Sequence, residues 1–191
     1  ADFGKLTTAQ MSKLSTAQVA ALTSTQTQGL TSAQAAALSS AQLNALTAGA
    51  FAKLDSGDLQ ALTTAAVSGF TTAQLASLAS ADFGKLTTAQ MSKLSTAQIA
   101  ALTSTQSQGL TTAQLAALGT SSIAAFSTSA FSKLSTAAIS KITPAQIAGI
   151  TTAQIANMTT DQAGALTTAQ IDKLSDSQYA SFGTAQLAAL N

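Results

Sequence analysis

The sequence predicts an all-α fold, a tightly wound solenoid (superhelix) of short helices with one helix in each eight-residue repeat. Three observations lead to this prediction. Apolar residues recur at every eighth position, a helix-capping pattern follows each of them, and the charged residues divide between the two ends of the expected helices. We expect residues 1–191 to form a single array of about 24 octads.

Two apolar columns define the octad. The first takes every eighth residue from Leu6 to Leu190, and all 24 of its positions are apolar. The second column begins at Phe3, three residues earlier, and residues three apart share one face of a helix. One long helix is excluded, because eight residues turn it about 80° beyond two full turns. A coiled coil needs a period of seven or eleven. The remaining alternative is a β-solenoid, but a strand would place the two columns on opposite faces.

Each octad also carries its own helix start. Ser or Thr follows the first column at 19 of 24 positions, and Gln follows three residues later at 16 positions. This is the capping box, in which the hydroxyl accepts from the N3 amide and the N3 side chain accepts from the N-cap amide. Pro144 falls at N1, the helical position that tolerates proline best. We expect a break near each Ser or Thr and helices of about five to seven residues.

The charged residues support the same register, because helix dipoles favour acidic groups at the N-terminus and basic groups at the C-terminus. Every Lys stands directly before the first column, and six of the seven Asp fall between N-cap and N3. Asp172 is the exception. The residues concerned are Lys5, Lys13, Lys53, Lys85, Lys93, Lys133, Lys141 and Lys173, and Asp2, Asp55, Asp58, Asp82, Asp161 and Asp176.

No octad is stable alone, since ordering eight residues costs about 8–16 kcal/mol and burying two Leu-sized side chains returns about 3–6 kcal/mol. The octads must therefore stack, and we expect the Ala at N2 to let neighbouring backbones approach. A larger period of ten octads lies over the single octads, since residues 1–38 recur at 81–118 with four substitutions. A half-period of five octads also appears, as in Lys13 and Lys53. Either duplication history explains it, or five octads complete a whole number of superhelical turns.

The composition removes most chemistry. Only 8% of the residues are charged, the net charge is +1, and His, Cys, Trp, Glu and Arg are absent. This excludes His acid–base catalysis, thiol nucleophiles, disulfides and the zinc sites that use Cys or His. A nucleic-acid partner would require a positive face. No apolar stretch approaches the roughly 18 residues of a membrane span. We expect no enzyme, no cofactor, no metal and no nucleic-acid partner.

The few candidate site residues have simpler structural interpretations. Asp55 and Asp58 resemble a weak Ca²⁺ site, but an N-cap with its N3 partner explains them better. Asp172 and Asp176 lie across a helix break. Nothing orients Lys173 and Tyr179 as a base and an acid. The Lys residues before the first column either bind an anionic surface or, as we prefer, compensate helix dipoles. The glycosylation sequon at residues 157–159 is interpreted as a chance match. The Phe residues of the second column are interpreted as core residues, namely Phe3, Phe51, Phe83 and Phe131. We therefore assign no catalytic, cofactor-binding or metal residue.

The LTTAQ octad, repeated over essentially the whole chain, resembles the Thr-Ala-Gln-rich octapeptide arrays of very large bacterial proteins, many of them adhesin-like or surface-exposed. The resemblance implies a non-enzymatic structural or interaction segment, a stalk, spacer or adhesive module, of a large secreted or surface bacterial protein. It implies an extracellular or cell-surface location, which a chain without Cys suits. We expect a segment of a longer protein.

Two further expectations concern interactions. A regular array of Ser and Thr hydroxyls on a weakly charged solenoid also fits an ice-binding protein, the alternative function. The exposed apolar faces at the two ends, with Leu187 and Leu190 at one of them, predict end-to-end self-association.

Overall fold

The computed structural model describes residues 3–190. Over this range the chain forms one 3-10 helix and 23 α-helices and no strand, which confirms the predicted all-α solenoid of short helices. The elements are η1 (Phe3–Lys5), α1 (Thr8–Met11), α2 (Thr16–Ala20), α3 (Ser24–Gln28), α4 (Ser32–Ala36), α5 (Ser40–Ala45), α6 (Ala48–Phe51), α7 (Ser56–Ala61), α8 (Thr64–Ser68), α9 (Thr72–Ser77), α10 (Ser80–Phe83), α11 (Thr88–Met91), α12 (Thr96–Ala100), α13 (Ser104–Gln108), α14 (Thr112–Ala116), α15 (Thr120–Ala125), α16 (Thr128–Phe131), α17 (Thr136–Ile139), α18 (Pro144–Ile147), α19 (Thr152–Ala156), α20 (Thr160–Gly164), α21 (Thr168–Ile171), α22 (Asp176–Tyr179) and α23 (Thr184–Ala189).

The α-helices are four to six residues long, slightly shorter than the sequence predicts. The difference arises at their C-terminal ends, where the last turn tightens to bonds between residues three apart. After α1, for example, the Lys13 N–H donates to the Gln10 carbonyl and the Leu14 N–H donates to the Met11 carbonyl. Such tightened last turns are common at helix ends. Pro144 stands at N1 of α18, as predicted.

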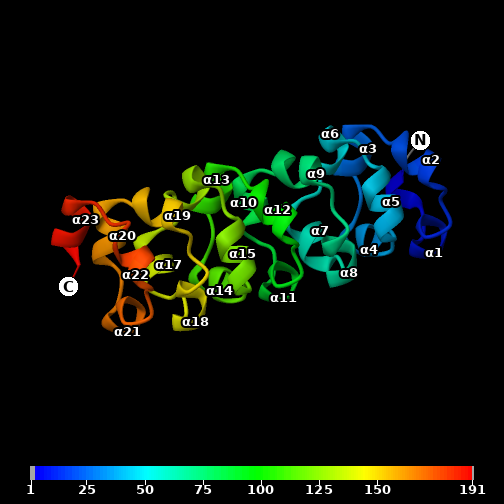
Figure 1. Cartoon of the computed structure of the whole chain (residues 1–191). Coiled ribbons are helices and arrows are strands. Elements are labelled where there is room, and N and C mark those ends of the chain that lie inside the picture. The colour runs from blue at the N-terminus through cyan, green and yellow to red at the C-terminus, as the bar shows by residue number, and fades with distance from the viewer. Residues whose placement is uncertain (1–2, 191) are drawn as a thin grey trace. The chain divides into compact units, whose positions relative to one another are not determined.

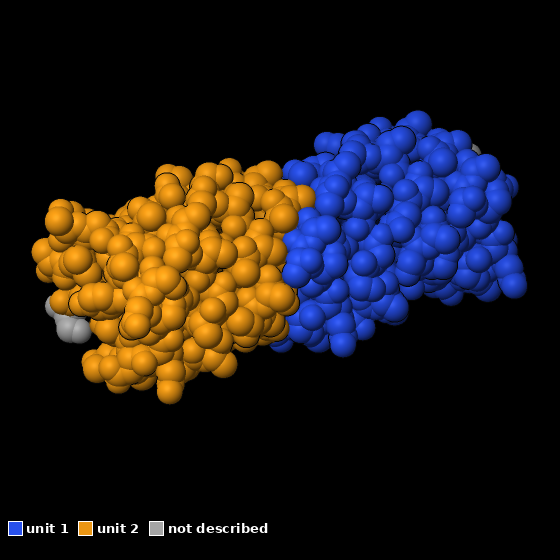
Figure 2. Space-filling view, viewed as in Figure 1, with its two compact units in different colours: residues 1–98 blue, residues 99–191 orange. Residues whose placement is uncertain are grey.

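The chain divides into two compact units, residues 1–98 and residues 99–191 (Figure 2). In both units helices pack against the third helix along the chain. In the first unit α2 lies beside α5 and α4 beside α7, and Figure 1 shows the helices following one another around a coil. In the second unit α17 contacts α20 and α20 contacts α23. None of the helices in residues 3–190 is long and apolar enough to cross a membrane.

Hydrogen bonds between successive turns measure the length of a superhelical turn. The Ser24 hydroxyl donates to the Gly49 carbonyl, 25 residues away, and the Gln74 amide donates to the Leu43 carbonyl, 31 residues away. A turn therefore takes 25 to 31 residues, which is more than three octads and fewer than four. Five octads then make more than one turn and fewer than two, so the explanation of the five-octad half-period by whole superhelical turns is wrong.

Both apolar columns form the core. Nearly all their side chains are buried, including Leu43, Leu59 and Ile99 at 0% exposure. Phe51 and Phe70, one from each column, meet edge to face with ring centroids 4.8 Å apart. The N2 residues are exposed in the α-helices of residues 3–190. Their backbone does meet the neighbouring turn in places, as where the Ser24 hydroxyl donates to the carbonyl of Gly49, the N2 residue of α6. The buried contact between turns falls at N3.

Candidate functional site: the glutamine ladder

The helix starts carry a reciprocal pair of hydrogen bonds. At α19 the Gln154 N–H donates to the Thr151 hydroxyl over 3.1 Å, and the Thr151 N–H donates to Gln154 Oε1 over 2.9 Å. The same pair occurs at α1 between Thr7 and Gln10. The Gln side chain thus uses its oxygen on its own helix, which leaves its NH₂ group pointing elsewhere.

That NH₂ group reaches the previous superhelical turn. Gln154 Nε2 donates to the carbonyls of Ile123, over 2.9 Å, and Phe126, over 2.8 Å. These two acceptors precede Gln154 by 31 residues and by 28 residues. We call the Gln residues that donate in this way the glutamine ladder. They include Gln34, Gln42, Gln74, Gln90, Gln98, Gln146, Gln154, Gln162, Gln170, Gln178 and Gln186, and all of these are buried.

The ladder explains why each of these positions holds Gln. A primary amide has one acceptor oxygen and two N–H donors, so one side chain caps its own helix and binds two carbonyls of the turn beneath. Glu would cap the helix equally well, but its second carboxylate oxygen, which is also an acceptor, would face two carbonyl oxygens that need donors. The capping pattern accounts for the oxygen of each Gln and leaves its NH₂ group unexplained. The sequence signal for this second role is that 16 capping positions hold Gln while the whole chain contains no Glu.

The ladder is interrupted at several N3 positions. Ala50 and Ala66 occupy N3 in α6 and α8, and Ala130 and Ala138 occupy it in α16 and α17. All four are buried. The Ala side chain has no donor that could bridge to the carbonyls of the previous turn, so the hydrogen bond from N3 is missing there. Two of these helices keep a different hydrogen bond to that turn, because Ser24 donates to a carbonyl of α6 and Ser40 donates to a carbonyl of α8.

Asp58 is another N3 residue, and it is 2% exposed. The N–H of Asp58 donates to Asp55 Oδ1 over 2.9 Å, and the N–H of Asp55 donates to Asp58 Oδ2 over 3.1 Å. Burial raises the pKa of Asp58, and the neighbouring charge of Asp55 adds to this rise, while hydrogen bonds from the Asp55 backbone and the Ser32 side chain oppose it. Both carboxylates therefore serve as helix caps. No group of three or more metal-ligating side chains occurs among residues 3–190.

The remaining Asp residues mostly occupy the expected positions. Asp82, Asp161 and Asp176 lie in the first turns of α10, α20 and α22, as predicted. Asp172 is the C-cap of α21, which agrees with its place as the one Asp outside the N-cap to N3 positions. Asp2 lies outside the described residues.

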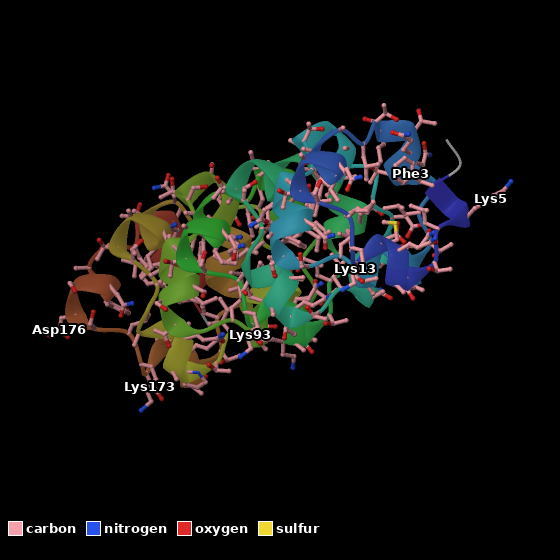
Figure 3. All side chains as sticks on the ribbon, turned by 90° about the vertical axis from the view of Figure 1, so that its right-hand side faces the viewer. Phe3, Lys5, Lys13, Lys93, Lys173 and Asp176 are labelled. Atoms are coloured by element: carbon pink, nitrogen blue, oxygen red, sulfur yellow. The ribbon has the colours of Figure 1, made fainter. Side chains whose placement is uncertain are left out.

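The Lys residues lie just beyond the helices, and not in their last turns as the dipole argument predicts. Apart from Lys5, each follows a four-residue helix and its C-cap residue, so no α-helix in residues 3–190 holds a Lys in its last turn. These residues are Lys13, Lys53, Lys85, Lys93, Lys133, Lys141 and Lys173. The cause is the short helix, which ends before the Lys. Their side chains are exposed, and that of Lys173 points away from the ribbon (Figure 3).

The other candidates form no common site. No hydrogen bond or ion pair in the described chain joins Lys173 to Tyr179, whose ring meets Phe182 edge to face at 6.2 Å. Asn157 of the sequon is the C-cap of α19, and its Nδ2 donates to the Ala153 carbonyl over 2.8 Å. The Phe residues of the second column belong to the core, as predicted: Phe51, Phe83 and Phe131 are fully buried and Phe3 is half-buried.

Comparison with known proteins identifies the repeat. The ALTTAQ repeat matches residues 1–32, 51–88, 75–112 and 139–168, which together cover more than half of the chain. A comparison with curated proteins gives no match. The matched segments contain the ladder residues Gln74, Gln90, Gln98, Gln146, Gln154 and Gln162, and the chain belongs to the ALTTAQ repeat family.

Proposed function

We propose that this chain is a non-enzymatic structural segment, a stalk or spacer, of a large secreted or surface protein of bacteria. The glutamine ladder is the observation that carries the proposal. Gln146, Gln154, Gln162, Gln170 and Gln178 occupy five successive octads and make the same contact with the turn before. A contact that repeats with every octad lets an array grow without any change in its local structure.

The use of interior polar groups supports the same function. The buried Gln side chains are engaged on both their oxygen and their nitrogen by the backbone, as at Gln154. Asp58, the buried carboxylate, caps its own helix. Catalysis requires titratable groups that are free to exchange protons with a substrate. Here the Gln amides of the interior are committed to holding one turn on the next.

The proposal is tested by changing the length of the array. One and then two extra copies of the ten-octad period are inserted in octad phase, and small-angle X-ray scattering measures the maximum dimension and the cross-section. A spacer gains the same length with each insertion at constant cross-section. Unequal increments, or a growing cross-section, contradict it. Binding of the labelled chain to cell surfaces would indicate the adhesive module instead.

Ice binding, the alternative function, requires hydroxyls that repeat in one flat plane. A superhelical turn takes 25 to 31 residues, which is not a whole number of octads. Equivalent hydroxyls of successive turns are therefore displaced around the solenoid. Some N1 hydroxyls are also engaged, as where Ser40 donates to the Ala65 carbonyl over 3.2 Å. Both features favour the spacer over the ice binder, and ice-crystal shaping at micromolar concentration would reverse this preference.

A further inference from the structure

Two stretches of the array lack the buried amide donors of the ladder in successive octads. In the first unit, Ala50, Asp58 and Ala66 occupy the N3 positions of α6, α7 and α8. In the second unit, Ala130 and Ala138 occupy the N3 positions of α16 and α17. Neither an Ala side chain nor an ionised carboxylate has a donor for the carbonyls of the turn before. Both stretches therefore depend on other contacts with that turn.

Serine hydroxyls bridge the first stretch. Ser24 and Ser40 each donate over 3.2 Å to a backbone carbonyl, the first in α6 and the second in α8. Between them Ser32 donates to the carboxylate of Asp58 in α7. We call these three contacts the serine bridges. They come from three successive octads, so every octad of the first stretch keeps a hydrogen bond to the turn before.

The second stretch has no such bridge. The corresponding hydroxyls belong to Ser104 and Thr112, which precede the N2 positions 129 and 137 by the same 25 residues that separate Ser24 from its acceptor. Within residues 3–190 neither hydroxyl donates to another turn. The two N2 carbonyls accept instead from the C-cap hydroxyls of their own helices, from Ser132 over 3.1 Å and from Ser140 over 3.0 Å. We call the contact of α16 and α17 with the turn before the seam, and it lacks both the ladder and the serine bridges.

The seam also contains unpaired polar groups. The ladder spacing of 31 and 28 residues places Ala138 opposite the carbonyls of Ser107 and Leu110, which no Gln amide reaches. Ser107 is 1% exposed, and its Oγ is the one buried side-chain N or O atom of the described chain without a hydrogen-bond partner. A buried polar group without a partner costs free energy, because folding removes it from water. The closed seam is therefore less stable than a ladder contact.

Apolar packing holds the seam closed. In it α16 lies against α13 and α17 lies against α14, with Phe131 and Ile139 fully buried. On their other side the same helices are tied to the turn that follows, because Gln162 donates to the Phe131 carbonyl and Gln170 donates to the Ile139 carbonyl. Apolar contacts have no required direction, whereas hydrogen bonds do. The seam is thus bound by hydrogen bonds on one side only.

We propose that the seam is a joint, which opens more readily than the ladder contacts that follow it while α16 and α17 stay attached to the next turn. Native proteins open locally in contiguous cooperative units, and regions with few buried contacts open at the lowest free energy. Opening separates α16 and α17 from α13 and α14 and exposes positions 130 and 138. The serine bridges hold the first unit closed at its own interruption. This inference goes beyond the spacer function and does not depend on it.

Single cysteines measure the opening, because the chain has no Cys of its own. Ala130→Cys and Ala138→Cys place a thiol at buried N3 positions of the seam, and Ala50→Cys and Ala66→Cys place one at buried N3 positions that have serine bridges. An uncharged thiol reagent reacts when the position opens, and its rate with each urea-unfolded variant normalises the data. The seam thiols should react about tenfold faster than the bridged thiols, which corresponds to one or two hydrogen bonds. Equal rates, or faster reaction of the bridged thiols, would overturn the proposal.

Removing a serine bridge should create a second joint. Ser40→Ala in the Ala66→Cys background should speed labelling about two- to tenfold, because one hydrogen bond between turns is lost. Thr72→Ala is the matched control, since Thr72 is an exposed N1 residue that donates to no other turn in residues 3–190. An unchanged rate in Ser40→Ala would show that the serine bridges do not hold the turns together.

Adding a ladder amide should close the seam. Ala130→Gln in the Ala138→Cys background supplies two donors to the turn before and should slow labelling about tenfold. Ser129→Gln, at the exposed N2 position of the same helix, should leave the rate unchanged. Labelling that slows equally in both variants, or in neither, would contradict a joint controlled by hydrogen bonds between turns. Circular dichroism of every variant verifies that its helices are retained.

Discussion

Replacing a ladder Gln with Glu separates its two roles, because Glu retains the capping acceptor and loses both donors. At Gln154 the change removes hydrogen bonds of 2.9 Å and 2.8 Å to the Ile123 and Phe126 carbonyls. A buried carbonyl left without its donor costs about 1–3 kcal/mol, and Ile123 lies at the low end of this range because its carbonyl still accepts from the Phe126 N–H over 3.4 Å. The site is 1% exposed, so water cannot replace the donors. We expect Gln154→Glu to lower the free energy of unfolding by about 2–5 kcal/mol at pH 7.

The loss should depend on pH. Burial and the facing carbonyls raise the pKa of the introduced Glu in the folded state above its ordinary value of about 4.3. A raised folded pKa means that the folded state holds its proton more tightly than the unfolded chain. The penalty is therefore smallest below the unfolded pKa, where a protonated Glu can still donate one hydrogen bond. It grows as the pH rises through the folded pKa.

Gln18→Glu is the matched control. Gln18 caps Ser15 in the same way, with the Ser15 N–H donating to Oε1 over 2.8 Å, but it is exposed and its Nε2 donates to no residue in 3–190. We expect a change within about 0.5 kcal/mol. Urea unfolding followed by circular dichroism at pH 4 and pH 7 measures both variants. If Gln154→Glu unfolds at the same urea concentration as Gln18→Glu at pH 7, the ladder does not stabilise the fold.

Three further substitutions test the contacts between turns, each by the same unfolding assay. Gly149→Ala should destabilise by about 1–3 kcal/mol, because a Cβ there would clash with Thr120 Cγ2 and lie 2.6 Å from the Thr120 carbonyl oxygen. Gly29→Ala, where the nearest contact of the new Cβ would be 3.6 Å away, should be tolerated. Ala138→Gln should add a ladder member facing the Ser107 and Leu110 carbonyls and stabilise by about 1–2 kcal/mol, while the same change at the exposed Ala137 should have little effect. Ser107→Ala should stabilise by about 1 kcal/mol, because Ser107 Oγ is the one buried side-chain N or O atom in residues 3–190 without a hydrogen-bond partner. Loss of stability in Ala138→Gln or Ser107→Ala would show that packing outweighs hydrogen bonding at those positions.

The sequence predicts the features that are decided within one octad. The N-cap at Thr151, the N1 position of Pro144 and the two buried columns depend on groups at most a few residues apart. Such groups meet in any short helix, so their spacing alone specifies them. The capping pattern also predicted where each helix begins, and only the tightened last turn shortened the helices.

Features decided between turns were not predictable in this way. The length of a superhelical turn depends on how helices three octads apart pack, and no spacing within an octad specifies that distance. The donors of Gln74 likewise find their acceptors at Leu43 and Leu46, in the previous turn. The carbonyl partners belong to backbone, which carries no signature of its own in the sequence.

The exclusive use of Gln at the ladder positions follows from these nonlocal partners. In an isolated helix Glu and Gln are interchangeable in the capping box, and Glu gains additionally from the helix dipole. Stacking reverses this preference, because the side chain then lies between an amide that donates to it and two carbonyls that accept from it. Only a group with an acceptor on one side and donors on the other satisfies both, and a buried carboxylate in the same place would lose its hydration without gaining a donor. A solenoid that uses one N3 side chain both to start each helix and to bind the turn before it therefore selects Gln at every ladder position.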